Sequence, residues 1–232
     1  MHQRVSNQHA KVVPHHAGDV FARTFDCDAD LSTAIAAKAT FQNYPPRATI
    51  LSARDKTPVI HVVISGQAQS VALAIDGRIV LVADYNIGDM FGEAAILSAH
   101  QMIDDVVAVD LVNTGRFGSA TFIGMIENYP RVALAVSRRL TERLSVTTRR
   151  MVEGATLSAG GRIHAELLRL ARAGDAMTIT PAPIFTEFAL RVHSTRETVS
   201  RAINALEKRG IVRRSDAGLT VVAPHRLEEL VY

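Results

Sequence analysis

Polar residues gather on one face of a predicted helix that begins near residue 194. Four of them, spaced one, three or four positions apart, would lie side by side at the N-terminal end of this helix: Arg196, Glu197, Ser200 and Arg201. An arginine can donate two hydrogen bonds to guanine, and a glutamate can accept one from cytosine. These residue types at this spacing favour a helix that reads base pairs in DNA.

The start of the same helix carries groups suited to a DNA phosphate. Ser194 or Thr195 can cap the helix, and the spacing from Ser194 to Glu197 fits a capping box. Because hydroxyls and free N–H groups at a helix N-terminus bind phosphate oxygens, we expect contacts from Ser194, Thr195 and Thr198. The opposite face has the apolar spacing of a helix packed on a small core: Val199, Ala202, Ile203 and Leu206.

The flanking segments predict a winged helix-turn-helix over residues 158–232, with Ser158 as the first N-cap. Residues 186–192 have the pattern of a short helix, and two helices joined by a tight turn form a helix-turn-helix. After Gly210, residues 211–214 and 219–222 have the pattern of two short strands joined by a turn. The alternative, an ordinary helix with a solvated charged face, leaves these neighbours unexplained.

Residues 161–222 resemble the winged helix of the bacterial cAMP receptor protein and FNR superfamily of transcription regulators, whose recognition helix begins S-R-E-T-V-x-R. The resemblance implies that Arg196, Glu197 and Arg201 read bases, and that RNA polymerase is a partner. Ser200 resembles the FNR branch, whereas Arg196 resembles the cAMP receptor branch, so a hybrid half-site is expected. His193 stands where the family usually has a glycine, which predicts a slightly strained turn.

Short strand-like segments between residues 21 and 129 predict an all-β barrel or jelly roll. Residues 59–64, 68–74 and 79–83 are separated by turn residues that include Gly66, Gly77 and Gly88. The order Y-P-P, I-S-G, D-G-R and G-D-M-F-G-E resembles the cyclic-nucleotide-binding β-roll of the same superfamily. We also expect a helix over the Ala-rich residues 28–42 and a flexible tail over residues 1–20.

The segment 130–157 predicts a long helix that mediates dimerisation. Four of its apolar residues form a stripe that suits a two-helix contact, here termed the dimer seam: Val136, Leu140, Leu144 and Met151. The alternative is a helix packed against its own domain. A two-fold dimer would place two recognition helices roughly 34 Å apart on a pseudo-palindromic site. Residues 154–161 contain three glycines and are the expected hinge. The predicted class is thus α+β: a β-roll, a dimerisation helix and a winged helix-turn-helix.

The resemblance also implies an effector pocket. In the cAMP receptor protein this pocket uses a Gly-Glu pair for the ribose, an Arg-Ser pair about ten residues later for the cyclic phosphate, and a Thr-Ser pair for the adenine. Gly92-Glu93 and Thr147-Thr148 match the first and last pairs. These four residues are the candidate effector pocket.

The arginine of the phosphate pair is missing from this chain. Met102 or Ile103 stands where it would fall, and Asp104 and Asp105 follow. Each charge-assisted hydrogen bond lost contributes about 1.5–3 kcal/mol, and His100 is a poor fixed cation because an ordinary imidazole has a pKa of about 6.5. We therefore expect no cAMP binding in the usual mode. Another effector, such as a cyclic dinucleotide, and constitutive DNA binding with structural roles for the pocket residues both stay open.

Composition agrees with a DNA-binding protein of two small domains. The chain has 232 residues, 47% of them hydrophobic, and a formal net charge of +3. Residues 185–214 alone hold seven Arg or Lys against three Glu, a net of +4, where DNA would bind. The sequence has no apolar run of 18 residues and no signal-peptide pattern, so we expect a cytoplasmic protein without a membrane partner.

Cysteine and histidine usage excludes several classes of site. The single Cys27 excludes an internal disulfide and a four-cysteine iron–sulfur cluster, and we expect it to lie against the core rather than act as a redox switch. The N-terminal histidines, at positions 2, 9, 15 and 16, match no compact metal site, so neither metal nor cofactor is expected. An enzyme is disfavoured because the chain lacks G-x-S-x-G, H-E-x-x-H and phosphate-loop motifs. A nucleotide sensor that controls a partner protein would leave the winged helix unexplained.

Overall fold

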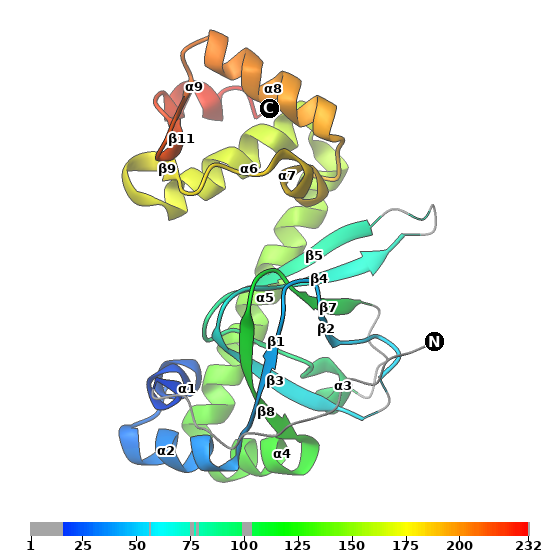
Figure 1. Cartoon of the computed structure of the whole chain (residues 1–232), viewed down its shortest axis with the longest axis vertical. Helices are drawn as coiled ribbons and strands as arrows, with labels where there is room; N and C mark the ends of the chain where they lie inside the picture. The colour runs from blue at the N-terminus through cyan, green and yellow to red at the C-terminus, as the bar shows by residue number, and fades with distance from the viewer. Residues whose placement is uncertain (1–15, 56, 75–76, 78, 99–103, 232) are drawn as a thin grey trace. The chain divides into compact units, whose positions relative to one another are not determined.

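The computed structural model describes residues 16–55, 57–74, 77, 79–98 and 104–231 (Figure 1). The chain divides into two compact units, residues 1–142 and 143–232. The first unit contains a β-roll and the second a winged helix-turn-helix, as predicted. The long helix α5 (Pro130–Thr156) contributes to both units.

Two four-stranded antiparallel sheets form the β-roll. Their orders are β1-β8-β3-β6 and β2-β7-β4-β5, and residues such as Val63, Phe91 and Val106 fill the core between them. The strands are β1 (Thr40–Tyr44), β2 (Thr49–Leu51), β3 (Val59–Ser65), β4 (Ala68–Leu73), β5 (Ile79–Tyr85), β6 (Met90–Phe91), β7 (Asp105–Ala108) and β8 (Val112–Gly118).

Helices cover the outer face of the sheet that contains β3 and β8. Because side chains alternate along a strand, Ile60, Val62 and Ile64 of β3 point to these helices, whereas His61 and Val63 point into the roll. Phe21, Phe122 and other apolar residues complete this second core. The helices of the unit, besides the first part of α5, are α1 (Ala17–Phe25), α2 (Ala29–Lys38), α3 (Ala94–Leu97) and α4 (Ser119–Asn128).

Two predictions for the N-terminal region are wrong in part. Residues 17–20 belong to α1, where Ala17 and Val20 are buried, while residues 1–15 of the predicted tail lie outside the described residues. The helix predicted over residues 28–42 ends at Lys38, and residues 40–44 form β1 along the edge of β8. Pairing with a strand about 70 residues away overrides the local helix preference there.

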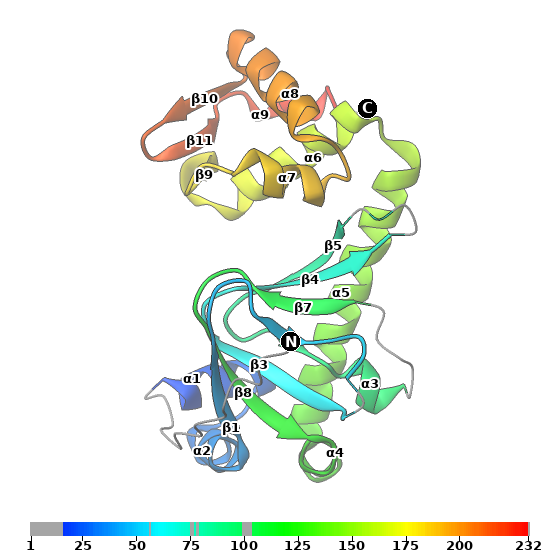
Figure 2. The same ribbon diagram turned by 45° about the vertical axis from the view of Figure 1, so that its right-hand side comes forward.

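The second unit packs helices α6, α7, α8 and α9 and a small sheet around one core. The sheet has the order β10-β11-β9 and is antiparallel, and its hairpin lies beside α8 (Figure 2). Ile163, Phe188, Ile203 and Leu219 are among the fully buried core residues. The elements after α5 are α6 (Ala159–Ala173), a 3-10 turn (Asp175–Met177), β9 (Thr178–Ile179), α7 (Phe185–Arg191), α8 (Arg196–Lys208), β10 (Val212–Ser215), β11 (Gly218–Val221) and α9 (Pro224–Glu228).

The segment predicted as a hinge is mostly helical. Gly154 lies inside α5, and Gly160 and Gly161 lie in the first turn of α6, so only Leu157 and Ser158 separate the two helices. Ser158 is the N-cap of α6, as predicted, because its side chain accepts a hydrogen bond from the Gly161 N–H at 3.0 Å. A Cβ on Gly161 would lie 2.6 Å from the carbonyl oxygen of Val231. Gly161 therefore allows α6 to pack closely on the backbone at Val231 and does not act as a flexible hinge residue.

Among the described residues, no helix combines the length and the apolar character needed to cross a membrane.

Candidate DNA-binding surface and effector pocket

The recognition helix α8 begins at Arg196, and Thr195 is its N-cap. The Thr195 hydroxyl accepts a hydrogen bond from the Thr198 N–H at 3.2 Å. Thr198, not Glu197, is thus the third helical residue, so the capping box predicted from Ser194 to Glu197 does not form. The cap leaves Thr195 exposed and Ser194 and Thr198 half-buried at the helix start, where a phosphate is expected.

The predicted polar face is present on α8. Arg196, Glu197 and Arg201 are exposed and Ser200 is half-buried at the N-terminal end of the helix. The opposite face is held in the core by three fully buried residues, Val199, Ile203 and Leu206. The sequence pattern therefore separates correctly into a face that anchors the helix and a face open to a partner.

Glu197 is prepared to act as a hydrogen-bond acceptor. Its own backbone N–H and the Thr195 side chain, with smaller contributions from Arg196 and Arg201, hold the pKa of its carboxyl below the usual value. The carboxylate is thus ionised near neutral pH, as an acceptor for a cytosine amino group must be. Arg201 Nη2 lies 3.4 Å from the Thr198 hydroxyl, which also lies 3.1 Å from the Thr195 hydroxyl.

The turn before α8 has a histidine in the left-handed region. His193 has φ of 49°, the conformation expected at the position where glycine is usual. The Ser194 N–H donates to the Ala189 carbonyl oxygen at 2.9 Å, which closes the turn onto α7. The left-handed conformation predicted at this position is confirmed by the backbone geometry.

The two arginines of the wing strand β10 have different surroundings. Arg214 donates to Asn204 Oδ1 at 2.6 Å, lies 3.6 Å from a Glu207 carboxylate oxygen, and its guanidinium lies 5.4 Å from the centre of the Phe185 ring. Arg213 is exposed. Arg214 is exposed as well, but its contacts tie the wing to α7 and α8.

Gly92 and Glu93 of the candidate effector pocket lie between β6 and α3. Gly92 has φ of 93°, and a Cβ there would lie 2.1 Å from the Val59 carbonyl oxygen, so the fold itself requires glycine. Glu93 is only 5% exposed, and its carbonyl oxygen accepts from the Ile96 and Leu97 N–H groups. A buried carboxylate at the start of α3 is compatible with either a structural role or a ligand contact.

Asp104 and Asp105, which follow the position of the missing phosphate-binding arginine, make hydrogen bonds within the β-roll. A carboxylate oxygen of Asp105 accepts hydrogen bonds from the Ala53 N–H at 2.7 Å and the Ser52 hydroxyl at 3.0 Å. Asp104 is hydrogen-bonded to the hydroxyl of the buried Ser70. His100, Met102 and Ile103 lie outside the described residues. The two carboxylates thus have structural partners on neighbouring strands and loops.

The predicted dimer seam divides into two parts along α5. Val136 is 3% exposed and Leu140 packs partly buried against the same core, so both are covered by their own domain. Assigning Val136 to the seam is therefore wrong, because apolar spacing alone does not identify the surface that a stripe covers. Leu144 and Met151, by contrast, are 67% and 69% exposed.

Thr147 and Thr148 lie on the exposed stretch between Leu144 and Met151. Their exposure places two hydroxyls among apolar side chains on one length of helix. Such a face suits a second helix, to which hydroxyls can also bond.

His61 is a buried polar residue that the sequence analysis missed. It points into the β-roll, where its ring stacks on Phe91 with centroids 5.0 Å apart, and Nδ1 lies 3.0 Å from the Thr114 hydroxyl. Burial, and secondarily the charge of Arg116, lower the pKa of its imidazole to about 3. The only sequence signal was a histidine at an inward position of an otherwise apolar strand.

Cys27 packs against the core of the first unit, as expected. Its Sγ lies 3.9 Å from the Phe21 carbonyl oxygen. Partial burial raises the pKa of the thiol, and Asp28 and Asp26 add to the increase. This environment disfavours the thiolate that a redox switch requires.

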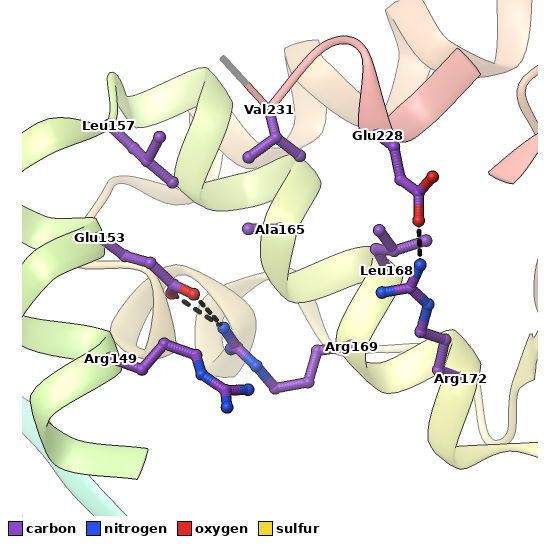
Figure 3. A pocket seen from close by; sticks show the side chains of 9 residues that line it. All are labelled: Arg149, Glu153, Leu157, Ala165, Leu168, Arg169, Arg172, Glu228 and Val231. Atoms are coloured by element: carbon purple, nitrogen blue, oxygen red, sulfur yellow. Dashed lines mark hydrogen bonds and ion pairs between the residues drawn. The ribbon is translucent and has the colours of Figure 1, made fainter. Parts of the chain in front are cut away.

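A cavity of about 470 Å³ lies within the second unit, between the last turns of α5, helix α6 and the C-terminal segment (Figure 3). Both Glu153 carboxylate oxygens lie 2.8 Å from Arg169 Nη2, and Glu228 pairs with Arg172. These pairs neutralise much of the charge around the cavity. The pairs connect α5 and α9 to α6, and we interpret the cavity as part of the packing contact between these helices.

Family comparisons match both units. Residues 41–129 match the family described as a cyclic nucleotide-binding domain, and residues 161–230 match the Crp-like helix-turn-helix domain. Both matches agree with the units that the structure shows.

Two relatives are named as transcription regulators. The chain is 28% identical over 184 residues to the "cAMP-activated global transcriptional regulator CRP" of Pasteurella multocida, which covers 77% of this chain and 87% of that protein. It is 26% identical over 179 residues to the "cAMP-activated global transcriptional regulator Vfr" of Pseudomonas aeruginosa, covering 74% and 84%.

Solved structures show the same fold. The chain is similar to a CooA mutant from Carboxydothermus hydrogenoformans, with a TM-score of 0.76, 18% identity and coverage of 91% of this chain and 95% of the other. FixK2 from Bradyrhizobium japonicum gives a TM-score of 0.72 at 22% identity, with coverage of 84% and 98%. At these identities the likeness concerns the fold alone.

Proposed function

Because this chain belongs to the cAMP receptor protein and FNR superfamily of DNA-binding transcription regulators, we propose that it acts as a homodimer on a pseudo-palindromic site and is not switched by cAMP in the usual way. The observation that carries the proposal is the exposed polar face at the start of α8. RNA polymerase is the expected partner on the promoter.

Base reading is assigned to four residues of α8: Arg196, Glu197, Ser200 and Arg201. The buried opposite face fixes the helix while this end projects into the major groove. Ser194, Thr195 and Thr198 at the helix start then lie where the phosphate backbone passes.

Dimerisation is supported by the exposed apolar residues of α5. Leu144, Met151 and Val152 are all at least half exposed, and Leu144 and Met151 are seven positions apart, the repeat of a two-helix contact. Exposed apolar residues on a long helix mark a protein contact. A two-fold partner would bury this face and set two α8 helices on successive turns of DNA.

Independence from cAMP is supported by the surroundings of Asp104 and Asp105. No arginine occurs between residues 94 and 105, where the family resemblance requires one. Asp105 instead closes the loop at Ser52 and Ala53 with two hydrogen bonds. A cyclic phosphate beside these carboxylates would meet like charge, with no guanidinium to compensate.

The alternative function is a nucleotide sensor whose ligand binds in the β-roll and switches DNA binding. The named relatives are described as cAMP-activated, and the buried Glu93 behind Gly92 matches the ribose pair of that family. A ligand other than cAMP, or constitutive DNA binding, is compatible with the same residues.

Selection of DNA sites from a random pool with the full-length protein, with and without cAMP, tests the proposal. We expect an enriched inverted repeat in both selections. Calorimetry supplies the second measurement: cAMP binding tighter than about 10 µM that is lost in Glu93→Ala contradicts independence from cAMP. Enrichment of a single half-site would contradict the homodimer.

A further inference from the structure

Arg162 connects three carbonyl groups near the recognition helix. It lies in the first turn of α6, and its guanidinium donates to the carbonyl oxygens of Leu157 (Nη1, 2.9 Å), Val192 (Nε, 2.9 Å) and His193 (Nη2, 3.3 Å). Leu157 directly follows α5, whereas the other two residues form the turn between α7 and α8. One side chain thus joins the end of α5 to the start of the DNA-reading segment.

The turn that Arg162 contacts has two local costs. His193 has φ of 49°, which a residue with a Cβ adopts less readily than glycine. Val192 follows the last residue of α7, where carbonyl groups lack helical partners and a positive charge is favourable. The guanidinium offsets both costs, because it supplies donors to Val192 and His193 and a charge at the helix end.

The helix that carries Arg162 is itself held in place. The Ser158 side chain caps its first turn, and Gly161 allows close approach to the Val231 backbone. Two turns further along, Arg169 Nη2 lies 2.8 Å from both Glu153 carboxylate oxygens of α5 (Figure 3). Arg162 therefore holds the turn from a fixed support rather than from a loop.

We propose that Arg162 is a positioning residue for the recognition helix. It holds the turn at His193 in the left-handed conformation and thereby sets the direction in which α8 leaves α7. Through Leu157 it also links this direction to the end of α5. The proposal rests on the proposed role of α8 in reading DNA, and it assigns Arg162 no contact with bases.

An arginine suits this role and a lysine does not. The planar guanidinium presents five donors in a fixed fork and can serve three carbonyls at once, whereas a lysine has one nitrogen on a flexible stem. Arg162→Lys keeps the positive charge but cannot bridge all three groups. Arg162→Gln removes the charge as well.

The test compares Arg162→Lys and Arg162→Gln with Arg172→Gln, a matched change at the other end of α6 that removes the pair with Glu228. For both Arg162 variants we expect about tenfold weaker binding to the selected site, less than about twofold change on random DNA, and near-normal binding for Arg172→Gln. Unchanged binding to the selected site by both Arg162 variants would overturn the proposal.

Combining Arg162→Lys with His193→Gly separates a positioning role of Arg162 from a general effect on stability. Glycine relaxes the turn, so His193→Gly should reduce the loss caused by Arg162→Lys to about threefold or less. An undiminished loss in this background would contradict the role of Arg162 at the turn.

Hydrogen exchange on the protein without DNA distinguishes failure of this inference from failure of the proposed function. In Arg162→Lys the Ser194 N–H, which bonds Ala189, should exchange about tenfold faster, while core amides of α6 such as Leu167 keep their protection. This readout holds even if no selected site is found. Equal exchange at Ser194 in the variant and the original protein overturns the proposal.

Discussion

Lowering the pH from 7 to 5 should destabilise the first unit through His61. The imidazole is 1% exposed, and burial, with a smaller effect of Arg116, lowers its pKa to about 3. In the unfolded chain the pKa returns to about 6.5. As the pH falls below 6.5, the unfolded state therefore binds a proton that the folded state does not bind until about pH 3.

The magnitude follows from this difference in proton binding. The stability contributed by a neutral His61 is fully present above pH 6.5 and is lost progressively as the pH falls towards 3. Each pH unit within this window costs about 1.4 kcal/mol, so the change from pH 7 to pH 5 should cost about 2 kcal/mol. The Phe91 ring and the Thr114 hydroxyl, both uncharged, offer an imidazolium no compensating charge.

Urea unfolding at pH 7, 6 and 5, followed by tyrosine fluorescence, measures the effect. The chain has no tryptophan, and three of its four tyrosines, at positions 44, 85 and 129, lie in the first unit. The control is His61→Gln, which keeps a polar group near Thr114 but does not titrate. The other histidines are common to both proteins, so the wild type should lose about 2 kcal/mol more than the variant between pH 7 and 5. Equal losses would refute the reasoning.

Three further predictions test other parts of the molecule. Arg196→Ala or Arg201→Ala should each weaken specific DNA binding by about 1–3 kcal/mol in anisotropy titrations and relax preference at one base pair per half-site, whereas equal losses on random DNA would indicate phosphate contacts only. Leu144→Asp should yield monomers by light scattering and abolish binding to the inverted repeat, and an intact dimer would place the contact elsewhere. Gly161→Ala should lower the unfolding free energy of the second unit by about 1–3 kcal/mol, because its Cβ would lie 2.6 Å from the Val231 carbonyl oxygen. The control, Gly154→Ala, has open space around the added Cβ and should be neutral or stabilising. Thermal unfolding compares the two variants, and a less stable Gly154→Ala would contradict this packing.

The winged helix-turn-helix could be predicted because its signals are local. Caps, helix spacing and turn residues act over a few positions, so the two helices, the hairpin and the left-handed His193 follow from short stretches of sequence. Two local predictions are wrong: the glycines of residues 154–161 do not form a hinge, and the cap was ambiguous because Ser194 and Thr195 were equivalent by type. In the structure Thr195 is the N-cap, so Glu197 is the second helical residue and not the third, which a capping box requires.

The errors in the first unit arise from contacts between distant segments. Residues 40–44 form a strand because β8 lies beside them, and Val136 is buried because it belongs to the core that residues of α1, β3 and β8 also form. The bonds that Asp105 makes to Ser52 and Ala53 span more than 50 residues, as does the contact of His61 with Thr114. None of these pairings is encoded in spacing along the chain.

The position of Arg214 bears on how binding should respond to salt. Counterion release depends on the number of phosphates that cations neutralise, with a slope of about −0.9 per phosphate in a plot of log affinity against log salt. Arg214 lies against Glu207, Asn204 and the Phe185 ring, so its charge is balanced within the protein. Each half-site should thus show a slope smaller by about one than a simple count of basic residues gives. The count of wing arginines therefore overstates the charge expected to neutralise phosphates, because Arg214 is paired within the protein.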